Sequence, residues 1–461
     1  MKTRFWLGFP ARAASALVVI GVTACGVGEG LPSPEGLRTP VVERGGGDCA
    51  DADGVFVVKP VECGTNTTAI QHALDCAAAW GPGSVVYLAA GTHYAGVIDV
   101  ADFHGLLLGA GNDCEDGTIL DTPASPDFDP ECLSEGEEPL LHPGGDGWVS
   151  WLRFEGGDFT MADMCLQPTS PTPAAFYAHP FGFGMAGNRC PGPDAAKPCN
   201  HIGQMVRIAG TETYASIDNV SFQAAPGTFN LWAGEQTNAQ MGVFLANDQG
   251  PAGFKAMFGS HTVEDSYFSE TVAGVFATGL AGGQPGRPPG PCPDDAVDRL
   301  QVVDNTFDTV SFSILPGTGS CYNYQVSDNE IRNGRTVGVQ ARQWISMDQP
   351  YAARSTYTVT DNDIEVTTPY MDGIDVMDGF SGDLMDVEVS DNKIEVQSGW
   401  GGLYVWQADG IRITDNTVVG SWFYGGIYIE DSDCVILDDN TIADVEPQIV
   451  LVNSTTCPLT D

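Results

Sequence analysis

A six-residue pattern that recurs along the chain constrains its fold more than any other feature. Written as apolar, any, Asp or Asn, any, any, apolar, it occurs nine times. The copies are MADMCL (161–166), IDNVSF (217–222), VEDSYF (263–268), VVDNTF (302–307), VSDNEI (326–331), VTDNDI (359–364), VSDNKI (389–394), ITDNTV (413–418) and LDDNTI (437–442). Three of the intervals between copies are 24 residues long. A fixed period in the twenties predicts a solenoid of stacked coils.

The segment GIYIEDSDCVILDDNTI (426–442) indicates how one coil is built. Its alternation places Ile427 and Ile429 on one face of a first strand, and Val435 and Leu437 on one face of a second. A period of two is typical of β-strands. Each strand is too short to be stable alone, so we expect successive coils to stack and bury a shared core.

The Asp-Asn pair within the pattern is interpreted as a structural corner. Its Asn falls at the same turn in six consecutive copies, where stacked coils would align the amides into a ladder of hydrogen bonds. We expect Asn also to adopt the left-handed backbone that a sharp corner needs. The predicted ladder residues are Asn305, Asn329, Asn362, Asn392, Asn416 and Asn440.

The N-terminal part of the repeat region predicts a cap. TNTTAIQHALDCAAAW (65–80) is an apolar-striped helix, with Asn66 or Thr67 as its N-cap. The strand-forming segments GSVVYLAAGTHY (83–94) and HGLLLGAGNDCEDGTIL (104–120) follow. With the repeats, this order resembles the right-handed parallel β-helix, or pectin-lyase-like, superfamily. The resemblance implies an all-β solenoid, a single-stranded right-handed parallel β-helix over residues 49–461, with an N-terminal capping α-helix and an Asn ladder. It does not imply one activity, because this fold carries lyases, hydrolases, epimerases and adhesins.

The N-terminus has the features of an export signal. A basic start precedes the apolar run ALVVIGV (16–22), which has signal-peptide proportions. VTAC (22–25) resembles the lipobox of bacterial lipoproteins, so we expect residues 1–24 to be a signal peptide and Cys25 to be lipidated. An ordinary signal peptide cleaved nearby is the alternative. The Gly- and Pro-rich residues 25–48 are predicted to be a flexible, lipid-anchored linker.

The number of cysteines and the net charge limit the cellular compartment and the class of partner. Besides Cys25 the chain has an even 12 cysteines and no CxxC pair, which favours disulfides in an oxidising compartment over zinc or redox chemistry. Cys190 with Cys199 and Cys434 with Cys457 are candidate local bridges. The formal net charge of −42 argues against a nucleic-acid partner. It also disfavours a polyanionic substrate unless salt or a divalent cation screens the charge.

Only outward side chains of a β-helix can meet a substrate, and alternation predicts two outward columns on the first strands of the coils. The first column contains Phe244, Phe276, Ser313, Gln340, Asp375, Tyr404 and Tyr428. The second contains Ala246, Thr278, Leu315, Arg342, Met377, Trp406 and Glu430. Adjacent coils lie about 4.8 Å apart, so Asp375 and Glu430 would be separated by about 9.6 Å along the axis.

These columns combine the residue types that bind and cleave sugars. The candidate substrate-binding residues are Gln340, Tyr404, Trp406 and Tyr428, because aromatic faces stack on sugar rings. Asp375, Glu430 and Arg342 are the candidate catalytic residues. The carboxylates have a spacing near that of an inverting glycosidase pair, whereas Arg342 could neutralise a uronate or act as the base of a lyase.

No metal ligand set is predicted, although Asp372, Asp375 and Asp378 could bind calcium through their oxygens. The same cluster is also typical of a solvated turn.

The sequence therefore predicts an exported β-helix, lipid-anchored at a bacterial outer membrane, cell surface or periplasm. Its expected partners are a polysaccharide and, through the anchor, a membrane, and we expect a monomer. The predicted activity is binding and cleavage of the polysaccharide, by a lyase or a glycoside hydrolase. The alternative is a non-catalytic adhesin or structural lipoprotein.

Overall fold

The structure is a computed structural model. It describes residues 49, 53–132, 148–169, 175–177, 201–227, 229–230, 235–237, 240–245, 249–250, 253–254, 257–278, 280–281, 298–316, 319–343, 355–368, 372–382, 385–444 and 446–458. The predicted signal peptide, Cys25 and the linker lie outside these residues.

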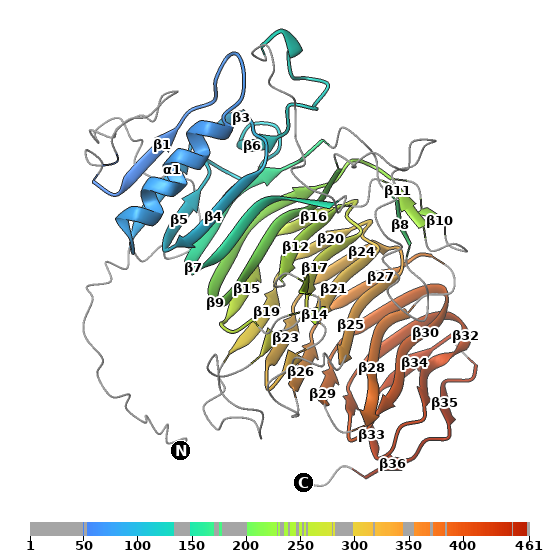
Figure 1. Cartoon of the computed structure of the whole chain (residues 1–461). Coiled ribbons are helices and arrows are strands. Elements are labelled where there is room, and N and C mark those ends of the chain that lie inside the picture. The colour runs from blue at the N-terminus through green and yellow to red at the C-terminus, as the bar shows by residue number, and fades with distance from the viewer. Residues whose placement is uncertain are drawn as a thin grey trace, which may run out of the picture. The chain divides into compact units, whose positions relative to one another are not determined.

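The chain winds into coils of three short strands, and each strand pairs in parallel with its counterpart in the next coil (Figure 1). This stacking makes three parallel faces, which we call faces A, B and C in their order along a coil. Face A contains β4 (Ile98–Phe103), β12 (Met241–Leu245), β17 (Ala273–Ala277), β21 (Phe312–Pro316), β25 (Val337–Gln343), β28 (Asp372–Gly382) and β35 (Ile449–Val452). The long strands β7 (Trp148–Leu166), β9 (His201–Gln223), β30 (Lys393–Ala408) and β32 (Thr417–Glu430) pass through more than one face.

Faces B and C complete the coils. Face B contains β1 (Val55–Val58), β2 (Ser84–Leu88), β5 (Gly105–Leu108), β15 (His261–Glu264), β19 (Arg299–Val303), β23 (Asn323–Ser327), β26 (Ser355–Thr360), β29 (Met385–Ser390), β31 (Arg412–Thr414), β33 (Val435–Asp438) and β36 (Thr456–Cys457). Face C contains β3 (Gly91–Tyr94), β6 (Thr118–Asp121), β16 (Tyr267–Ser269), β20 (Thr306–Asp308), β24 (Glu330–Gly334), β27 (Asp363–Val366) and β34 (Thr441–Ala443). The predicted all-β parallel solenoid is confirmed.

Three small sheets lie outside the coils. They are formed by β8 (Ala175–Tyr177), β10 (Phe229–Asn230) and β11 (Glu235–Thr237), by β13 (Gln249–Gly250) and β14 (Gly253–Phe254), and by β18 (Leu280–Ala281) and β22 (Gly319–Ser320).

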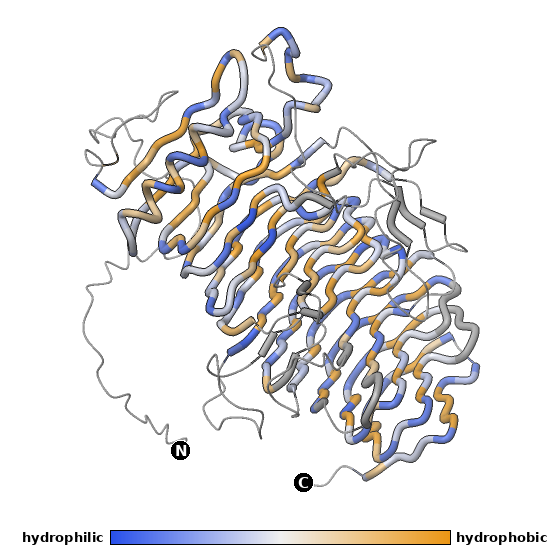
Figure 2. Tube along the Cα trace, viewed as in Figure 1, coloured by the Kyte–Doolittle hydropathy of each residue, from blue (hydrophilic) through white to orange (hydrophobic). Residues whose placement is uncertain are grey.

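The core runs along the inside of the stacked coils. Apolar and polar residues alternate along many of the strands (Figure 2), as expected for strands with one buried side. Equivalent side chains of successive coils stack on one another. The rings of Phe222, Phe268 and Phe307, for example, lie 4.6 and 4.7 Å apart between centroids. The residues predicted to point inward in the last coils, Ile427 and Ile429, are fully buried. Each coil therefore buries its apolar side chains against the next coil.

The predicted Asn ladder is confirmed at the corner between faces B and C. The Nδ2 of each Asn from 305 to 416 donates to the Oδ1 of the Asn in the next coil, at 2.9 to 3.0 Å. The same amide groups also donate to backbone carbonyls, as Asn392 does to Val359 and Ser390. The backbone N–H of each Asn from 305 to 416 donates to the same Oδ1 of its neighbour. The ladder thus satisfies the polar groups of a buried corner.

The predicted role of Asn in the left-handed backbone was wrong in the six Asp-Asn copies. There the preceding Asp has the positive φ, for example 58° at Asp361 and Asp391. The third position of the pattern is left-handed in all nine copies, and the residue is Asn only at Asn219. The Asn of the Asp-Asn pair instead uses its side chain, which must point into the corner to reach its neighbours.

The N-terminal helix is confirmed as α1 (Thr67–Trp80), followed later by the short 3₁₀ helix η3 (Pro130–Cys132). Asn66 occupies the N-cap position but makes no side-chain cap bond, and its Nδ2 donates to the carbonyl of Lys59. The apolar side of α1, including Ile70 and Leu74, packs onto the first coils. The helix thereby covers core residues at the N-terminal end of the stack.

Four disulfide bonds join described cysteines. They are Cys49–Cys76, Cys63–Cys132, Cys114–Cys165 and Cys434–Cys457. The last confirms one predicted local bridge, and the other, Cys190 with Cys199, lies outside the described residues. Disulfides are typical of proteins that fold in an oxidising compartment. No helix of the described residues is long and apolar enough to cross a membrane.

Candidate active site

A bend in the strands of face A decides which side chains leave the core. At Gly373 an added Cβ would lie 2.3 Å from Cγ2 of the core residue Ile394, so this position faces inward with no space for a side chain. The next residue, Ile374, is also buried in the core. Two successive inward positions turn the flanking residues, Asp372 and Asp375, to the outside together. The same glycine recurs at the equivalent position of β25, where a Cβ at Gly338 would lie 2.6 Å from Ile364.

The strand register brings the candidate residues into two neighbouring rows. In the first row Gln340 pairs with Asp375, Asp375 with Tyr404, and Tyr404 with Tyr428. In the second row Arg342 pairs with Met377, Met377 with Trp406, and Trp406 with Glu430. All seven residues singled out in the sequence therefore lie on four successive strands of face A, namely β25, β28, β30 and β32.

Side-chain contacts connect several of these residues directly. Gln340 Nε2 donates to Asp375 Oδ2 at 2.5 Å, and Tyr404 Oη donates to Glu430 Oε2 at 3.3 Å. The rings of Tyr404 and Tyr428 are stacked with centroids 5.6 Å apart. We call Asp372, Asp375 and Glu430, with Gln340 and Tyr404, the carboxylate cluster.

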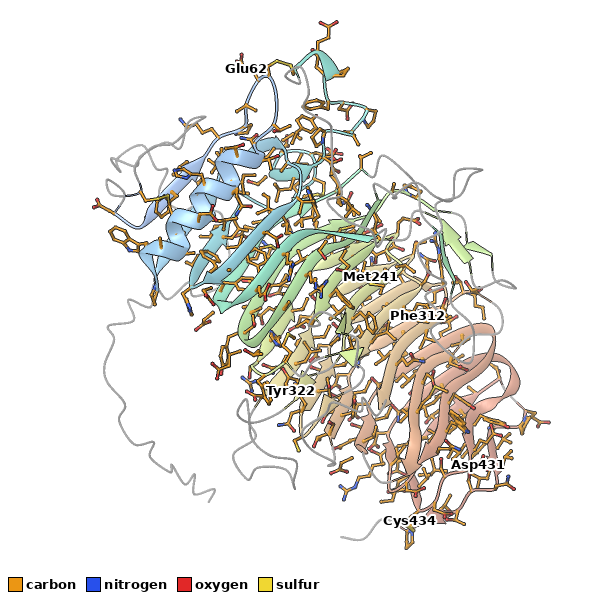
Figure 3. The ribbon with its side chains drawn as sticks, viewed as in Figure 1. Glu62, Met241, Phe312, Tyr322, Asp431 and Cys434 are labelled. Atoms are coloured by element: carbon orange, nitrogen blue, oxygen red, sulfur yellow. A yellow bond between two sulfur atoms is a disulfide. The ribbon has the colours of Figure 1, made fainter. Side chains whose placement is uncertain are left out.

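Burial distinguishes the cluster from an ordinary strand surface. Asp372 is 7% exposed, and Gln340 and Asp375 are each 5% exposed. Further along face A the outward side chains form a second apolar cluster, separate from the core, which includes Met241 and Phe312 (Figure 3). Phe244, a predicted outward position, belongs to this apolar cluster and is 4% exposed.

The low-polarity setting shifts the ionisation of two members of the cluster. Burial, and then the neighbouring Asp375 carboxylate, raise the pKa of Asp372 well above its ordinary value. The Gly401 amide, which donates to Asp372 Oδ1 at 2.8 Å, acts in the opposite direction. Burial also raises the pKa of Tyr404, with further contributions from Glu430, Asp375 and Asp372. The Tyr404 hydroxyl is therefore neutral and lies in the field of three carboxyl groups.

Two positions of the predicted columns were wrong. Ser313 is fully buried and occupies the inward position of the glycine column, where it aligns with Gly274 and Gly338. Leu315 does point outward, but it pairs with Phe276 and so belongs to the first row. Simple alternation fails here because the bend inserts one extra inward residue.

Arg342 and Trp406 complete the second row. Arg342 lies on β25, but its side chain is outside the described part of the structure. Trp406 is half-buried beside the row of tyrosines. Asp372 was noticed in the sequence only as a calcium ligand. Its distinguishing signal is the Asp-Gly-Ile-Asp order, in which an inward glycine separates two outward carboxyls.

The predicted calcium site stays a prediction, because the side chain of Asp378 lies outside the described residues. Among the described side chains, one group brings three potential metal ligands within 4.8 Å of one another, namely Cys49, His72 and Cys76. The two cysteines form a disulfide with each other, and their sulfur atoms are therefore not thiolate ligands.

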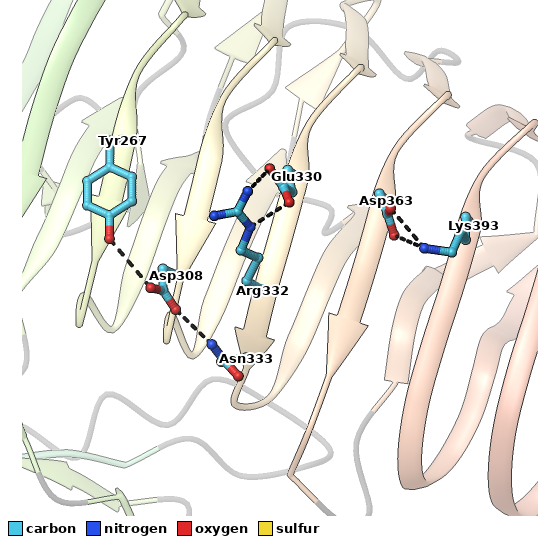
Figure 4. Close-up of polar contacts among 7 residues, drawn as sticks. All are labelled: Tyr267, Asp308, Glu330, Arg332, Asn333, Asp363 and Lys393. Atoms are coloured by element: carbon cyan, nitrogen blue, oxygen red, sulfur yellow. Dashed lines mark hydrogen bonds and ion pairs between the residues drawn. The ribbon is translucent and has the colours of Figure 1, made fainter.

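Face C offers a contrasting set of polar contacts (Figure 4). Lys393 pairs with Asp363 at 2.9 Å, and the side chains are 59% and 56% exposed. Asn333 donates to Asp308 at 3.0 Å, and Arg332 forms an ion pair with Glu330. These groups are solvated and paired, so face C has the features of a polar surface, whereas face A holds carboxyl groups away from water.

Comparisons with known proteins agree with the fold. A family model described as the right handed beta helix region matches residues 318–460. The comparison with curated proteins found no match.

Among solved structures, DFA-IIIase from Arthrobacter chlorophenolicus A6 without its lid is similar with a TM-score of 0.44 and 13% identity, over 84% of this chain and 86% of that chain. The same enzyme in complex with DFA-III gives a TM-score of 0.41 and 12% identity, over 83% and 79%. The A-module of the Azotobacter vinelandii mannuronan C-5 epimerase AlgE6 gives 0.31 and 13%, over 86% and 97%.

The matched residues 318–460 include the carboxylate cluster and five of the six asparagines of the ladder. The chain folds as a right-handed parallel β-helix, and its C-terminal coils match the family model of that region.

Proposed function

We propose that the protein is an exported enzyme that binds a polysaccharide along face A and hydrolyses it at the carboxylate cluster. The observation that carries this proposal is the burial of two carboxyl groups, Asp372 and Asp375, on the same face as a third one, Glu430, which accepts a hydrogen bond from Tyr404. Carboxyl groups whose ionisation is shifted by burial, as that of Asp372 is, concentrate at functional sites.

In this proposal Asp375 is the general acid that protonates the leaving glycosidic oxygen. Its carboxyl group is oriented by the amide of Gln340. Glu430 is the general base that activates water, and the hydroxyl of Tyr404 fixes its orientation. Hydrolysis needs one protonated and one ionised carboxyl group, and unequal environments provide them.

The backbone spacing supports an inverting geometry. Glu430 lies two coils from Asp375, about 9.6 Å along the stack, and two residues further along the strand, about 6.6 Å. In this proposal the two side chains span part of this separation, and Tyr404, whose hydroxyl contacts Glu430, lies between them on β30. Inverting glycosidases hold their carboxyl groups about 6.5–9.5 Å apart, which leaves room for the attacking water.

Aromatic side chains next to the cluster suit the binding of sugar rings. The stacked rings of Tyr404 and Tyr428 and the half-buried Trp406 offer apolar faces, while Gln340 offers amide hydrogen bonds. The net charge of −42 favours a neutral polysaccharide. Lyase chemistry at Arg342 would instead require an anionic substrate, together with calcium or high salt.

The test is cleavage of a panel of neutral and uronate polysaccharides by the purified ectodomain, residues 26–461, with and without calcium. We expect new reducing ends from a neutral substrate without an unsaturated product. Asp375→Asn should lower kcat by about 10²–10⁴, the range that general acid catalysis contributes. Asp386→Asn is the matched control, because Asp386 is an exposed carboxylate on face B.

Each other outcome has a defined meaning. Formation of unsaturated uronate products that requires Arg342 would show that the protein is a lyase and not a hydrolase. Binding of a polysaccharide without products, by protein with an intact fold, would favour the non-catalytic adhesin.

The N-terminal residues give the proposal its cellular setting. Residues 1–24 would be removed on export, Cys25 would carry lipid, and residues 26–48 would tether the body to a bacterial membrane. Cys25→Ser should abolish incorporation of labelled palmitate and release the protein from membranes. Unchanged labelling of this variant would contradict the anchor.

A further inference from the structure

We propose that Cys49, His72 and Cys76 form a zinc site when the disulfide bond between the two cysteines is reduced. The three residues take no part in the carboxylate cluster, so this inference does not depend on the proposed function. It gives the chain two ways of fastening Cys49 to helix α1. One is the disulfide bond of the oxidised protein, and the other is a zinc ion bound by the reduced protein.

The first argument is the arrangement of the three side chains. His72 and Cys76 are four residues apart on α1, so they lie on the same side of the helix. The disulfide bond places Cys49 against them, with its Cα atom 5.4 Å from that of Cys76. The potential ligand atoms of the three residues all lie within 4.8 Å of one another. The fold therefore brings three metal ligands together from two separate segments of the chain.

The distance between His72 and Cys76 suits a shared zinc ion. Sγ of Cys76 lies 3.6 Å from Nε2 of His72 and 3.9 Å from its Nδ1. In a tetrahedral site with a Zn–S bond of about 2.3 Å and a Zn–N bond of about 2.1 Å, the sulfur and nitrogen ligands lie about 3.6 Å apart. His72 can therefore keep its position when the ion binds, and only the two sulfur atoms must move apart once their bond is broken.

The second argument concerns access and charge. Cys76 is 2% exposed, whereas Cys49 is only partly buried. A small reductant and a metal ion can therefore approach from the side of Cys49. The formal net charge of −42 raises the concentration of cations near the protein surface. Two thiolates also balance the charge of a zinc ion, so the occupied site is neutral beside the buried side of the helix.

The third argument is that this histidine is not a general feature of the disulfide bonds. Among the described side chains, no second group of three His, Cys, Asp or Glu residues has its ligand atoms within the same 4.8 Å. The other described disulfide bonds therefore have no comparable third ligand. They are Cys63–Cys132, Cys114–Cys165 and Cys434–Cys457.

The change between the two states requires a dithiol as the reductant. The dithiol gives two electrons and two protons to the disulfide bond, which becomes two thiols, and is itself oxidised to a disulfide. The two thiols release their protons when zinc binds, and the neutral imidazole of His72 and a water molecule complete four ligands. Sulfur ligands favour zinc over calcium or magnesium, which prefer oxygen. The bound ion then closes the same loop as the disulfide bond.

The first measurement titrates the phosphine-reduced ectodomain with cobalt(II), which occupies zinc sites and absorbs visible light when it is tetrahedral. We expect one cobalt ion per chain, with thiolate charge-transfer absorption that excess zinc removes. His72→Ala should weaken binding about tenfold or more, and Cys49→Ser combined with Cys76→Ser should abolish it. Cys434→Ser combined with Cys457→Ser is the matched control and should leave binding unchanged. Equal affinity of the wild type and His72→Ala, or binding that survives the loss of Cys49 and Cys76, would overturn the proposal.

A second measurement avoids reduction, because a reductant also opens the other disulfide bonds. Cys49→His cannot form the disulfide bond and offers an imidazole beside His72 and Cys76. Without reductant this variant should bind one cobalt ion and unfold at a higher temperature with zinc, whereas Cys49→Ala should bind about tenfold more weakly or less. If Cys49→His has a native circular dichroism spectrum and binds no cobalt, the site is excluded. Neither measurement involves a polysaccharide, so this inference and the proposed function fail independently.

Discussion

The Asn ladder and the carboxylate cluster are both buried and polar, and both lie on stacked strands, yet they are built in opposite ways. In the ladder Asn392 donates to two carbonyls and to Asn416 Oδ1, and its own Oδ1 accepts from Asn362. The arrangement repeats from coil to coil. In the cluster Asp372 and Asp375 are buried in one coil, and burial followed by the Asp375 carboxylate raises the pKa of Asp372. A fully hydrogen-bonded repeat indicates a structural group, whereas a buried carboxyl group with a raised pKa in a single coil suggests a function.

The largest effect should come from breaking the ladder in its middle. Asn392→Ala leaves buried carbonyls and two neighbouring Asn residues without partners, which should cost about 2–4 kcal/mol of stability. Asn440→Ala is the matched control at the end of the ladder, where Asn440 is only half-buried and water can replace it. Urea unfolding of both variants measures the difference, and an equal loss for the two would contradict a cooperative ladder.

An opposite change in stability is expected at the cluster. The folded-state pKa of Asp372 is raised, so the protonated form is preferred in the folded protein. The wild type therefore loses stability as the pH rises from the unfolded pKa of about 3.9 to the raised folded pKa. Asp372→Asn removes this cost and should gain on the order of 1–3 kcal/mol at neutral pH.

The gain of Asp372→Asn should disappear at about pH 3, where the carboxyl group is protonated in both the folded and the unfolded states. Thermal unfolding across this pH range is the measurement. A variant less stable than the wild type at neutral pH would place Asp372 among the structural groups, with the ladder.

The smallest effect is expected for the exposed pair on face C (Figure 4). Lys393→Ala removes an ion pair with Asp363 whose partners are both more than half exposed. Solvent screening limits such pairs to about 0–0.5 kcal/mol. Arg335→Ala provides the contrast, because Arg335 and Glu270 are 15% and 22% exposed. Equal thermal midpoints for the two variants would show that burial does not determine how much these ion pairs contribute to stability.

Local pattern was sufficient to predict most of the architecture. Period-two alternation identified the inward residues Ile427 and Ile429, and the repeated Asp-Asn pair identified every rung of the ladder. The register of Tyr404 and Tyr428 also followed from the repeat, because the two residues lie one 24-residue repeat apart. These features depend on neighbouring residues within a coil or on the repeat period, and both can be identified in the amino-acid sequence.

Other features depend on contacts between coils and could not be predicted. Alternation misplaced Ser313, because the close packing of the glycine column against core side chains inserts a second inward residue. The left-handed residue at the corner is Asp rather than Asn, because the ladder needs the Asn side chain to point into the corner. The burial of Phe244 depends on what covers face A, which no local pattern records.

The sequence by itself determined the solenoid, its ladder and the face on which the candidate residues lie, because a short repeat fixes strand, corner and period together. Only the tertiary structure decided that Asp372 and Asp375 share a dry site and that Tyr404 joins Glu430 to it. Burial and electrostatic interactions depend on contacts between side chains of neighbouring coils, and these contacts form only when the coils stack.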